Sequence, residues 1–294
     1  MKRCTLLLSS LVLSLALTSA ASAQAPKTKS GFVTTADGAK IHYIQAGTSK
    51  QPTILFVPGW TMPAWIWEHQ IVHLAKTHRV VAMDPRSQGN SSQESEGLYP
   101  AARARDIKAV VDQLKLAPVV LVGWSMGVTE IAAYVDQFGT DGIAGIVLVD
   151  GIAGSDFDPK ITPQVLPWAA SFQVDRPKAT AAFVRTMYQK PQSEEYLNRV
   201  TQAALRTPTN SAVALLTAVF TSDYRPALAK IDRPALVVVA GDEKTNPYFS
   251  WYKDVQQRIS GAKLEAVPGT GHALFVDDAP RFNSLLDDFL RTLK

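Results

Sequence analysis

Residues Val119–Gly127 read VVLVGWSMG, and this stretch decides the fold. Four apolar residues, which predict a buried strand, run directly into the pattern Gly-x-Ser-x-Gly. A helical pattern, Met126–Phe138, follows and is closed by Gly139. A strand, a sharp turn and a helix in this order expose the serine at the apex, Ser125, as a candidate nucleophile. The helix N-terminus beneath it favours negative charge at the site.

Further short apolar runs lie on both sides of this stretch at wide spacing. Their continuous Val, Ile and Leu content is typical of strands buried on both faces of a parallel sheet. Amphipathic helical patterns lie between them, including Pro100–Leu116 and Pro280–Leu290. Strand and helix alternate, so we expect an open α/β sheet, mostly parallel, with helices on both faces. The runs are Thr53–Val57, Val80–Met83, Gly145–Val149, Ala235–Ala240 and Lys263–Val267.

One long stretch, from residue 155 to about residue 230, breaks the alternation because it holds helical patterns and no strand-like run. About 75 residues between two strands predict an inserted helical cap. Its aromatic residues, among them Trp168 and Phe172, either face a substrate or form the core of the cap and its seat on the sheet.

The N-terminal segment, residues 1–23, has a basic start, a leucine-rich run at Thr5–Leu17 and the small-residue pattern Ala21–Ala23. These three features predict a secretory signal peptide cleaved near Ala23. A membrane anchor is the alternative, but the apolar run is short for a bilayer span of about 20 residues. We expect a linker at 24–30, one domain over 31–294 and a periplasmic or secreted protein without integral membrane contact after cleavage.

The composition of the chain excludes several classes of protein. The 294 residues carry 30 basic and 26 acidic side chains, a formal charge of +4 that falls to +2 without the signal segment. This weak, dispersed charge gives no support for a nucleic-acid partner. The one cysteine, Cys4, lies in the signal segment, so no disulfide framework or thiolate cluster is expected. Phosphate-binding and zinc-binding spacings are also missing, so we expect neither cofactor nor metal.

A serine nucleophile needs a general base, and His272 is the candidate. The stretch Val267–Phe275 reads VPGTGHALF, so a strand feeds a glycine-rich loop that ends at this histidine. Such a loop reaches the carboxyl edge of the sheet, where α/β proteins bind ligands. We interpret the other histidines as solvated or hydrogen-bonded; they are His42, His69, His73 and His78.

Four motifs, in this order along the chain, resemble those of the α/β-hydrolase fold superfamily from about Gly31 to the C-terminus. The first is Pro58-Gly59-Trp60, at the position of the family's oxyanion loop, and the second is Met83–Ser91, similar to its D-x-R-G-x-G-x-S turn. The serine turn and Gly271-His272 complete the set. The resemblance implies the α/β-hydrolase fold with an inserted cap. We interpret Asp84 and Arg86 as structural residues that tie down a turn near the site, and Asp106 as structural or solvated.

The resemblance also implies an oxyanion hole formed by the backbone N–H groups of Trp60 and Met126. The chain departs from the family's usual His-Gly by carrying Pro58-Gly59, which does no harm if the proline position is not the donor. Trp60 is otherwise a core aromatic or a pocket residue. We expect a hydrophobic substrate pocket that includes Trp60, Trp124, Trp168 and Phe172.

The acid that orients the histidine is less clear from the sequence. The family most often places it after the strand Ala235–Ala240, in a pattern like G-x-x-D, but this chain reads GDEK there. Asp242 or Glu243 could serve only if this turn is reshaped. Asp150 ends the strand after the nucleophile, as in some dehalogenases of the superfamily, and is the preferred candidate.

Ser125 and His272 together predict acyl transfer through an acyl-enzyme. We expect an exported serine hydrolase that acts on a small-molecule substrate, a hydrophobic ester or lactone. Thioester or C–C bond hydrolysis, acyl transfer and perhydrolysis are alternatives that use the same acyl-enzyme or oxyanion hole. A ligand-binding protein on the hydrolase scaffold is an alternative of another class, favoured only by the displaced acid motif.

Overall fold

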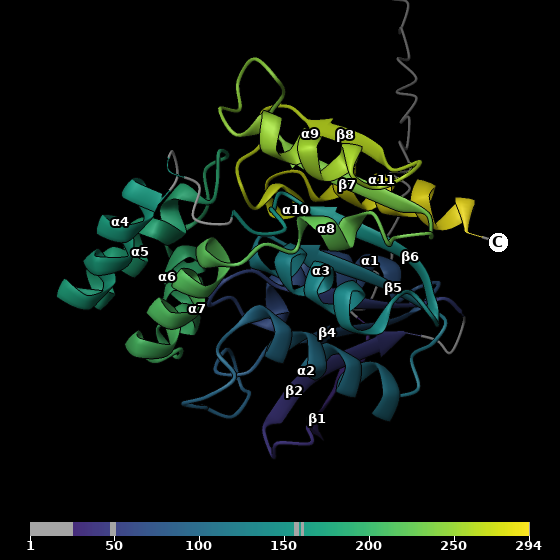
Figure 1. Cartoon of the computed structure of the whole chain (residues 1–294), viewed down its shortest axis with the longest axis horizontal. Coiled ribbons are helices and arrows are strands. Elements are labelled where there is room, and N and C mark those ends of the chain that lie inside the picture. The colour runs from purple at the N-terminus through teal and green to yellow at the C-terminus, as the bar shows by residue number, and fades with distance from the viewer. Residues whose placement is uncertain (1–25, 48–50, 156–158, 160–161, 294) are drawn as a thin grey trace, which may run out of the picture.

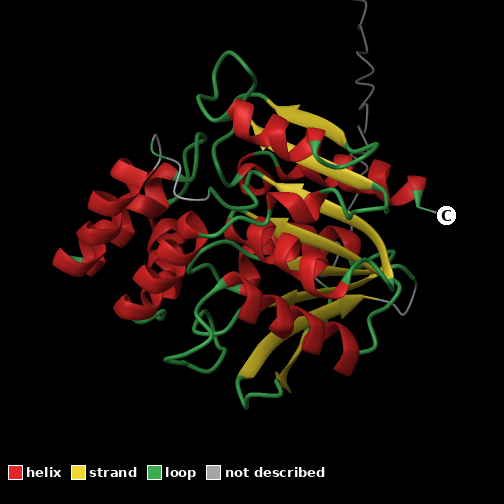
Figure 2. Ribbon diagram, in the orientation of Figure 1, coloured by secondary structure: helices red, strands yellow, loops and turns green. Residues whose placement is uncertain are grey.

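The computed structural model of the chain describes residues 26–47, 51–155, 159 and 162–293. Its centre is an eight-stranded sheet with the order β1-β2-β4-β3-β5-β6-β7-β8 (Figure 1; Figure 2). β2 is antiparallel to both of its neighbours, and all other adjacent strands are parallel, which confirms the predicted α/β-hydrolase fold. The strands are β1 Lys29–Thr34, β2 Lys40–Gly47, β3 Thr53–Val57, β4 Arg79–Met83, β5 Val119–Trp124, β6 Ile143–Val149, β7 Ala235–Ala240 and β8 Lys263–Val267.

Helices cover both faces of this sheet (Figure 2). One face packs against the short 3₁₀ helix Ala64–Trp67, α1 Glu68–Leu74, α10 Leu274–Asp277 and α11 Ala279–Thr292. The other face packs against α2 Pro100–Gln113, α3 Met126–Phe138, α8 Arg225–Leu228 and α9 Phe249–Gln257.

Successive residues of the central strands point to opposite faces, which explains why these strands read as continuous apolar runs. In β3, Ile54 and Phe56 face α1 and α11, whereas Leu55 and Val57 face α2 and α3. All four side chains are buried. Each such burial contributes about 1.5–3 kcal/mol, so two apolar layers hold the sheet between its helices.

The register of the parallel strands brings the chemistry-bearing turns to one edge. Val57 of β3 pairs with Gly123 of β5, and Trp124 of β5 pairs with Val149 of β6. The next residues along these strands therefore leave the sheet side by side at its carboxyl edge. The segments that follow β3, β5, β6 and β8 carry Trp60, Ser125, Asp150 and His272.

An inserted helical region between β6 and β7 stands apart from the sheet layers, on the left of Figure 1. In its described part, α4 packs on α7 and α5 packs on α6. A backbone bridge between Gly154 and Asp223 closes the neck of the insert. The cap was expected to run to about Lys230, but α8 returns to the sheet and packs on α3. The four cap helices are α4 Thr162–Val174, α5 Arg176–Thr186, α6 Glu194–Leu205 and α7 Thr209–Thr221.

The N-terminal part of the chain differs in one detail from the expectation. The predicted linker, 24–30, overlaps β1, because Lys29 and Ser30 already pair with Gln45 and Ile44 of β2. The predicted signal peptide, residues 1–23, lies outside the described residues. Within the described ranges, no helix is both long enough and apolar enough to cross a bilayer.

Candidate active site

The turn after β5 holds Ser125 in a strained backbone conformation with φ 55° and ψ −118°. The two arms of the turn approach so closely that a Cβ added at Gly123 would lie 2.6 Å from the carbonyl oxygen of Gly127. The Ser125 N–H donates to the carbonyl of Val149 at 2.9 Å, which ties the apex to β6. A non-glycine residue persists at such a φ only when its surroundings impose it, and this is typical of functional sites.

Asp150 and His272 form a hydrogen-bonded pair beside this turn. The His272 Nδ1 lies 2.6 Å from one carboxylate oxygen of Asp150. The other oxygen accepts from the Ala240 N–H at 2.9 Å, so the carboxylate plane is fixed. The Asp150 side chain is 3% exposed and the histidine 29% exposed, so the imidazole extends from a buried acid toward the cavity. Asp150 also has a positive φ, 42°.

The alternative acid, Asp242, is used by its own turn. One carboxylate oxygen accepts from the backbone N–H groups of Lys244 and Thr245 and from the Thr245 hydroxyl, all within 3.0 Å. The Thr245 hydroxyl, followed by the Lys244 N–H, lowers the pKa of Asp242. Glu243 is exposed on the same turn. Of the three candidates, the structure therefore brings only Asp150 to the histidine.

Tyr252 of α9 is a site residue that sequence reasoning missed. It is buried and lines the same cavity as Asp150. Burial, and then the nearby carboxylate, raise the pKa of Tyr252 well above its ordinary value. The phenol therefore keeps its proton beside the acid. No motif could have revealed it, because it lies in an ordinary amphipathic helix, eight residues after the expected family position of the acid.

The loop after β3 lies against the nucleophile turn. A Cβ added at Gly59 would come within 2.9 Å of the Ser125 Cβ, so only glycine allows this approach. Trp60 and Met126, the two predicted oxyanion residues, both line the cavity that Ser125 faces. Met126 is the first residue of α3, where a backbone N–H has no partner within the helix. Within the described part of the chain, the Trp60 N–H likewise donates to no protein acceptor.

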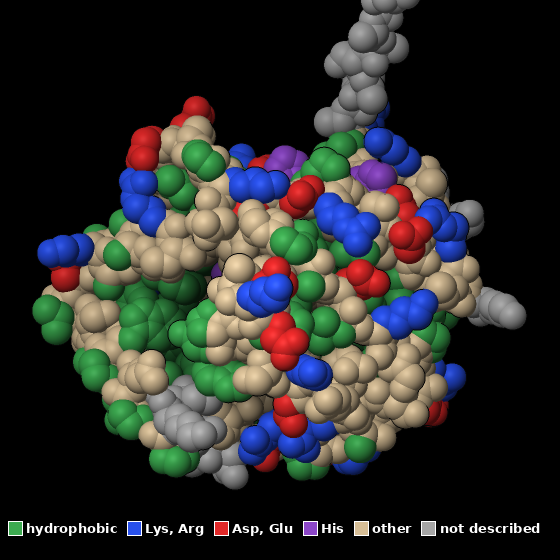
Figure 3. All heavy atoms as spheres, turned by 90° about the horizontal axis from the view of Figure 1, so that it is seen from above, with side chains coloured by type: hydrophobic (Ala, Val, Ile, Leu, Met, Phe, Trp, Pro, Cys, Tyr) green, Lys and Arg blue, Asp and Glu red, His purple; other side chains and the backbone are tan. Residues whose placement is uncertain are grey.

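A cavity of about 920 Å³ connects the site to the inserted helices. Figure 3 shows the molecule hollowed beside these helices, with hydrophobic side chains gathered in the hollow. Among its described lining residues, the only members of the set Asp, Glu, Lys, Arg and His are the pair Asp150 and His272. The wall is mainly apolar and aromatic on both sides. The cap side includes Val165, Trp168, Phe183, Leu216, Val219 and Phe220; the opposite side includes Pro247, Tyr248, Trp251 and Tyr252.

Two of the four residues expected in the pocket lie behind its wall. Trp124 is buried under the histidine, to whose backbone carbonyl its indole N–H donates at 2.9 Å. Phe172 is fully buried and packs edge-on against the ring of Trp60. Trp60 itself donates from its indole N–H to the Ala212 carbonyl of α7 at 2.7 Å. Trp60 and Trp168 do line the cavity, as expected.

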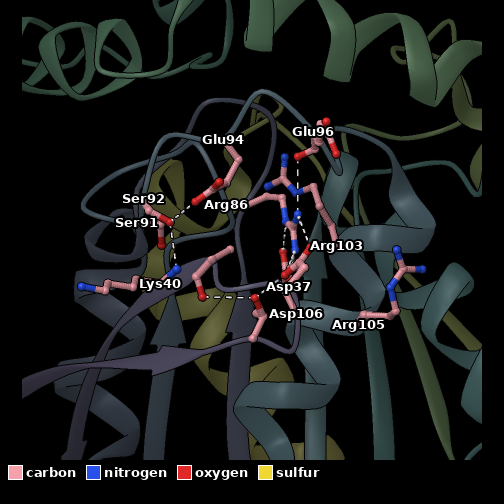
Figure 4. A network of polar contacts seen from close by, with 12 residues as sticks. Asp37, Lys40, Arg86, Ser91, Ser92, Glu94, Glu96, Arg103, Arg105 and Asp106 are labelled. Carbon is pink, nitrogen blue, oxygen red and sulfur yellow. Dashed lines mark hydrogen bonds and ion pairs between the residues drawn. The ribbon is translucent and has the colours of Figure 1, made fainter.

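The remaining predicted residues are Asp84 and Arg86, which follow β4, and Asp106 of α2. Asp84 accepts from the Ala64 and Asn90 N–H groups and contacts His42 Nδ1 at 2.7 Å. Arg86 makes two hydrogen bonds to Asp106, drawn in Figure 4. These contacts fit the structural roles expected for them. In the described residues, no group of three potential ligands comes together as a metal site.

Comparisons with known proteins identify the family and the fold. The sequence pattern of the Alpha/beta hydrolase family matches residues 54–285. The bifunctional esterase/perhydrolase of Acinetobacter calcoaceticus is 28% identical over 277 residues, which are 89% of this chain and all of that protein. The non-heme haloperoxidase of Rhodococcus erythropolis is 27% identical over 89% of this chain and 99% of its own.

Two solved structures show the same arrangement of the backbone. The bromoperoxidase from Bacillus anthracis has a TM-score of 0.81 and 26% identity, over 90% of this chain and 100% of that one. A putative aryl esterase from Burkholderia cenocepacia has a TM-score of 0.78 and 26% identity, over 90% of this chain and 99% of that one. With its fold, its serine turn and a family match over most of its length, the chain belongs to the alpha/beta hydrolase family.

Proposed function

We propose that this chain is an exported serine hydrolase that cleaves a small, hydrophobic carboxylic ester or lactone through an acyl-enzyme on Ser125. The observation that carries the proposal is the hydrogen-bonded pair of Asp150 and His272, which lines one cavity with the strained serine turn. A nucleophile, a base and a carboxylate that orients the base are the parts of a catalytic triad.

The first half of the reaction forms the acyl-enzyme. The Asp150 carboxylate holds the proton of His272 on Nδ1, which leaves Nε2 free to take the proton of Ser125 as Oγ attacks the carbonyl carbon. The carbonyl oxygen becomes an oxyanion that accepts from the N–H groups of Trp60 and Met126. When the tetrahedral intermediate collapses, the C–O bond to the alcohol breaks and the imidazolium returns its proton to that alcohol.

The second half releases the acid. Water enters, His272 takes one of its protons, and the hydroxide oxygen attacks the acyl carbon. A second oxyanion forms in the same hole and collapses with departure of the Ser125 oxygen, which recovers its proton. The carboxylic acid product is thereby released and the free serine hydroxyl is restored.

The cavity wall supports a neutral, hydrophobic substrate. The aromatic and aliphatic side chains on both sides of the catalytic residues match apolar groups on the acyl and alcohol parts. No lysine or arginine is among the described lining residues, so an anionic group in the substrate would lose hydration without gaining a cationic partner. A relative of known structure is described as a putative aryl esterase, which agrees with an aromatic ester.

The test is hydrolysis of p-nitrophenyl acetate and butyrate by the chain without its first 23 residues, with Ser125→Ala as the control. We expect turnover by the wild type, none above background by the variant, and labelling of Ser125 by a fluorophosphonate probe. Equal, slow rates for both proteins and no labelling would leave a ligand-binding protein on a hydrolase scaffold. A panel of esters, lactones and thioesters then ranks the substrate classes.

Perhydrolysis is a second candidate, because one relative that matches over its whole length is described as a bifunctional esterase/perhydrolase. In this reaction hydrogen peroxide replaces water in the second half, and the acyl group leaves as a peracid while Ser125 recovers its proton. The test is formation of peracetic acid from an acetate ester and hydrogen peroxide. Peracid formation that disappears in Ser125→Ala supports this activity, and ester cleavage without peracid excludes it.

Export is proposed from the N-terminal sequence alone. Expression of the full chain in a Gram-negative host and N-terminal sequencing of the product test this. A periplasmic protein that begins at or near Gln24 supports cleavage after Ala23. A product that retains residues 1–23 in the cytoplasm or in the membrane contradicts it.

A further inference from the structure

The buried side-chain amide of Gln88 is hydrogen-bonded to the backbone of the oxyanion loop. Its Nε2 donates two hydrogen bonds, to the carbonyl of Gly59 at 3.0 Å and to the carbonyl of Met62 at 3.0 Å. The Gly59 carbonyl also accepts from the Met62 N–H at 3.1 Å. Both hydrogens of the amide are thus used, and the turn 59–62 is closed on itself and on Gln88.

The peptide that Gln88 holds is the one that carries the proposed oxyanion donor. The carbonyl of Gly59 and the N–H of Trp60 belong to the same planar peptide unit and point in opposite directions. With the carbonyl held toward Gln88, the N–H is directed away from it. Trp60 lines the cavity of Ser125, and Gly59 lies against the serine Cβ. A hydrogen bond to the carbonyl also polarises the peptide and strengthens its N–H as a donor.

Gln88 is itself held by a buried ion pair between α2 and α3. Its Oε1 accepts from Nη1 of Arg103 at 3.0 Å, and Nε of Arg103 lies 2.9 Å from Oε1 of Glu130. All three side chains are buried. Figure 4 shows that Arg103 lies close to the hydrogen-bonded pair of Arg86 and Asp106.

This arrangement is poorly explained by stability alone. Burying an ion pair costs desolvation energy that its attraction often only offsets, and apolar residues of similar volume commonly do as well. The Arg103–Glu130 pair instead fixes which way the amide of Gln88 faces: Oε1 toward the guanidinium and Nε2 toward the loop carbonyls. A flipped amide would put its NH₂ against the guanidinium and its oxygen against two carbonyl oxygens.

We propose that Gln88 is the positioning residue of the oxyanion hole: it holds the Gly59–Trp60 peptide so that the Trp60 N–H meets the developing oxyanion. This inference rests on the proposed function, because it gives that N–H its role. Gln88 is not among the described residues that line the cavity. Its effect therefore belongs to the transition state and not to substrate binding.

The experiment compares Gln88→Met and Gln88→Glu with the wild type. The first removes both donors and keeps the length of the side chain. The second keeps an acceptor for Arg103 but turns a carboxylate toward the carbonyls of Gly59 and Met62. The matched control is Gln93→Glu, the same chemical change at an exposed glutamine whose Nε2 donates to the Arg206 carbonyl, away from the oxyanion loop.

The measurements are kcat and KM for p-nitrophenyl butyrate and the affinity for phenylboronic acid, which forms a tetrahedral adduct on a catalytic serine. Removing a whole oxyanion donor costs about 10²–10³-fold in kcat, so we expect its misplacement to cost about 10- to 100-fold. The boronic acid should lose affinity by a similar factor, with KM changed less than about threefold. Gln93→Glu should match the wild type.

Three outcomes would overturn the proposal. Unchanged kcat and boronic acid affinity in folded Gln88→Met would show that Gln88 only braces the loop. A rise in KM alone would assign it to substrate binding. A wild type that neither hydrolyses esters nor binds the boronic acid through Ser125 would remove the proposed function, and this inference with it. Circular dichroism melting checks each fold, and Gln88→Met decides if Gln88→Glu does not fold.

Discussion

Replacing Asp150 by asparagine tests the centre of the proposed mechanism, because the structure dictates how the new amide must face. One oxygen of Asp150 accepts from the Ala240 N–H, and the other accepts from His272 Nδ1. In Asp150→Asn, the amide oxygen must take the Ala240 side, because the alternative would set two N–H donors against each other. The amide NH₂ then faces His272 and donates to Nδ1.

A donor at this position stabilises the wrong tautomer of His272, with its proton on Nε2. The imidazole can then no longer accept the proton of Ser125. Restoring the right tautomer requires flipping the amide and leaving the buried Ala240 N–H unsatisfied, at a cost of about 1–3 kcal/mol. The neutral amide also no longer stabilises the charge of the imidazolium. In a triad of this kind the same change lowers kcat by about 10⁴-fold, or about 5 kcal/mol of transition-state stabilisation.

The assay is steady-state hydrolysis of p-nitrophenyl butyrate, with circular dichroism melting to confirm the fold. Asp242→Asn is the matched control, because this carboxylate only caps its own turn. We expect kcat of the control to stay within about threefold of the wild type, since surface changes of this kind have small effects. If Asp150→Asn retained kcat within tenfold while Asp242→Asn lost orders of magnitude, the reasoning from the two oxygens of Asp150 would be refuted.

Three further changes test other parts of the structure. Gly59→Ala would place a Cβ 2.9 Å from that of Ser125, so we expect fluorophosphonate labelling to slow by about 10²-fold; labelling at the wild-type rate would contradict the close approach. Trp168→Ala opens the cap wall of the cavity. The ratio of kcat/KM for an octanoate ester to kcat/KM for the acetate should therefore rise about tenfold. An unchanged ratio would show that this wall does not limit the length of the acyl chain. Arg86 lowers the pKa of Asp37 to about 2 from 3.8, so the stability that this carboxylate adds is fully present above about pH 4 and is lost as the pH falls toward 2. The Tm of Asp37→Asn, measured by circular dichroism from pH 6 to pH 2.5, should therefore lie below that of the wild type at pH 6 and approach it in acid. A difference in Tm that stays constant with pH would contradict this.

The sheet could be predicted from the sequence because its signals are local. The bounds of β3, β7, β8 and α3 agree residue by residue with the apolar runs and the helical pattern. The helix expected at Pro100–Leu116 is shorter and ends at Gln113, because Lys115 takes a φ of 53° before the next strand. Pattern alone cannot place such an end, since the apolar residues after Gln113 continue the helical spacing.

The site was predictable only where one turn carries the whole signal. Ser125 lies in such a turn, and Trp60 lies in another, the loop after β3. The sequence favours Asp150 as the acid but keeps Asp242 and Glu243 as alternatives. The turns after β6 and β7 both leave the sheet on the side of His272, and only the path of each turn decides which carboxylate reaches it. Tyr252 and its neighbour in the cavity wall, Trp251, come from α9, a helix with an ordinary amphipathic pattern. Place in the sequence and residue type predict Trp124 and Phe172 in the pocket, but their side chains turn into the core.

Trp60 links the inserted helices to the chemistry through a single residue. Its backbone belongs to the oxyanion loop, its indole N–H donates to Ala212 of α7, and its ring packs against Phe172 and Phe183. The insert is therefore not a module that can be exchanged freely between members of the family. A chimaera that grafts another cap onto this sheet must also supply an acceptor and an aromatic seat for this indole, or it will change turnover together with substrate choice.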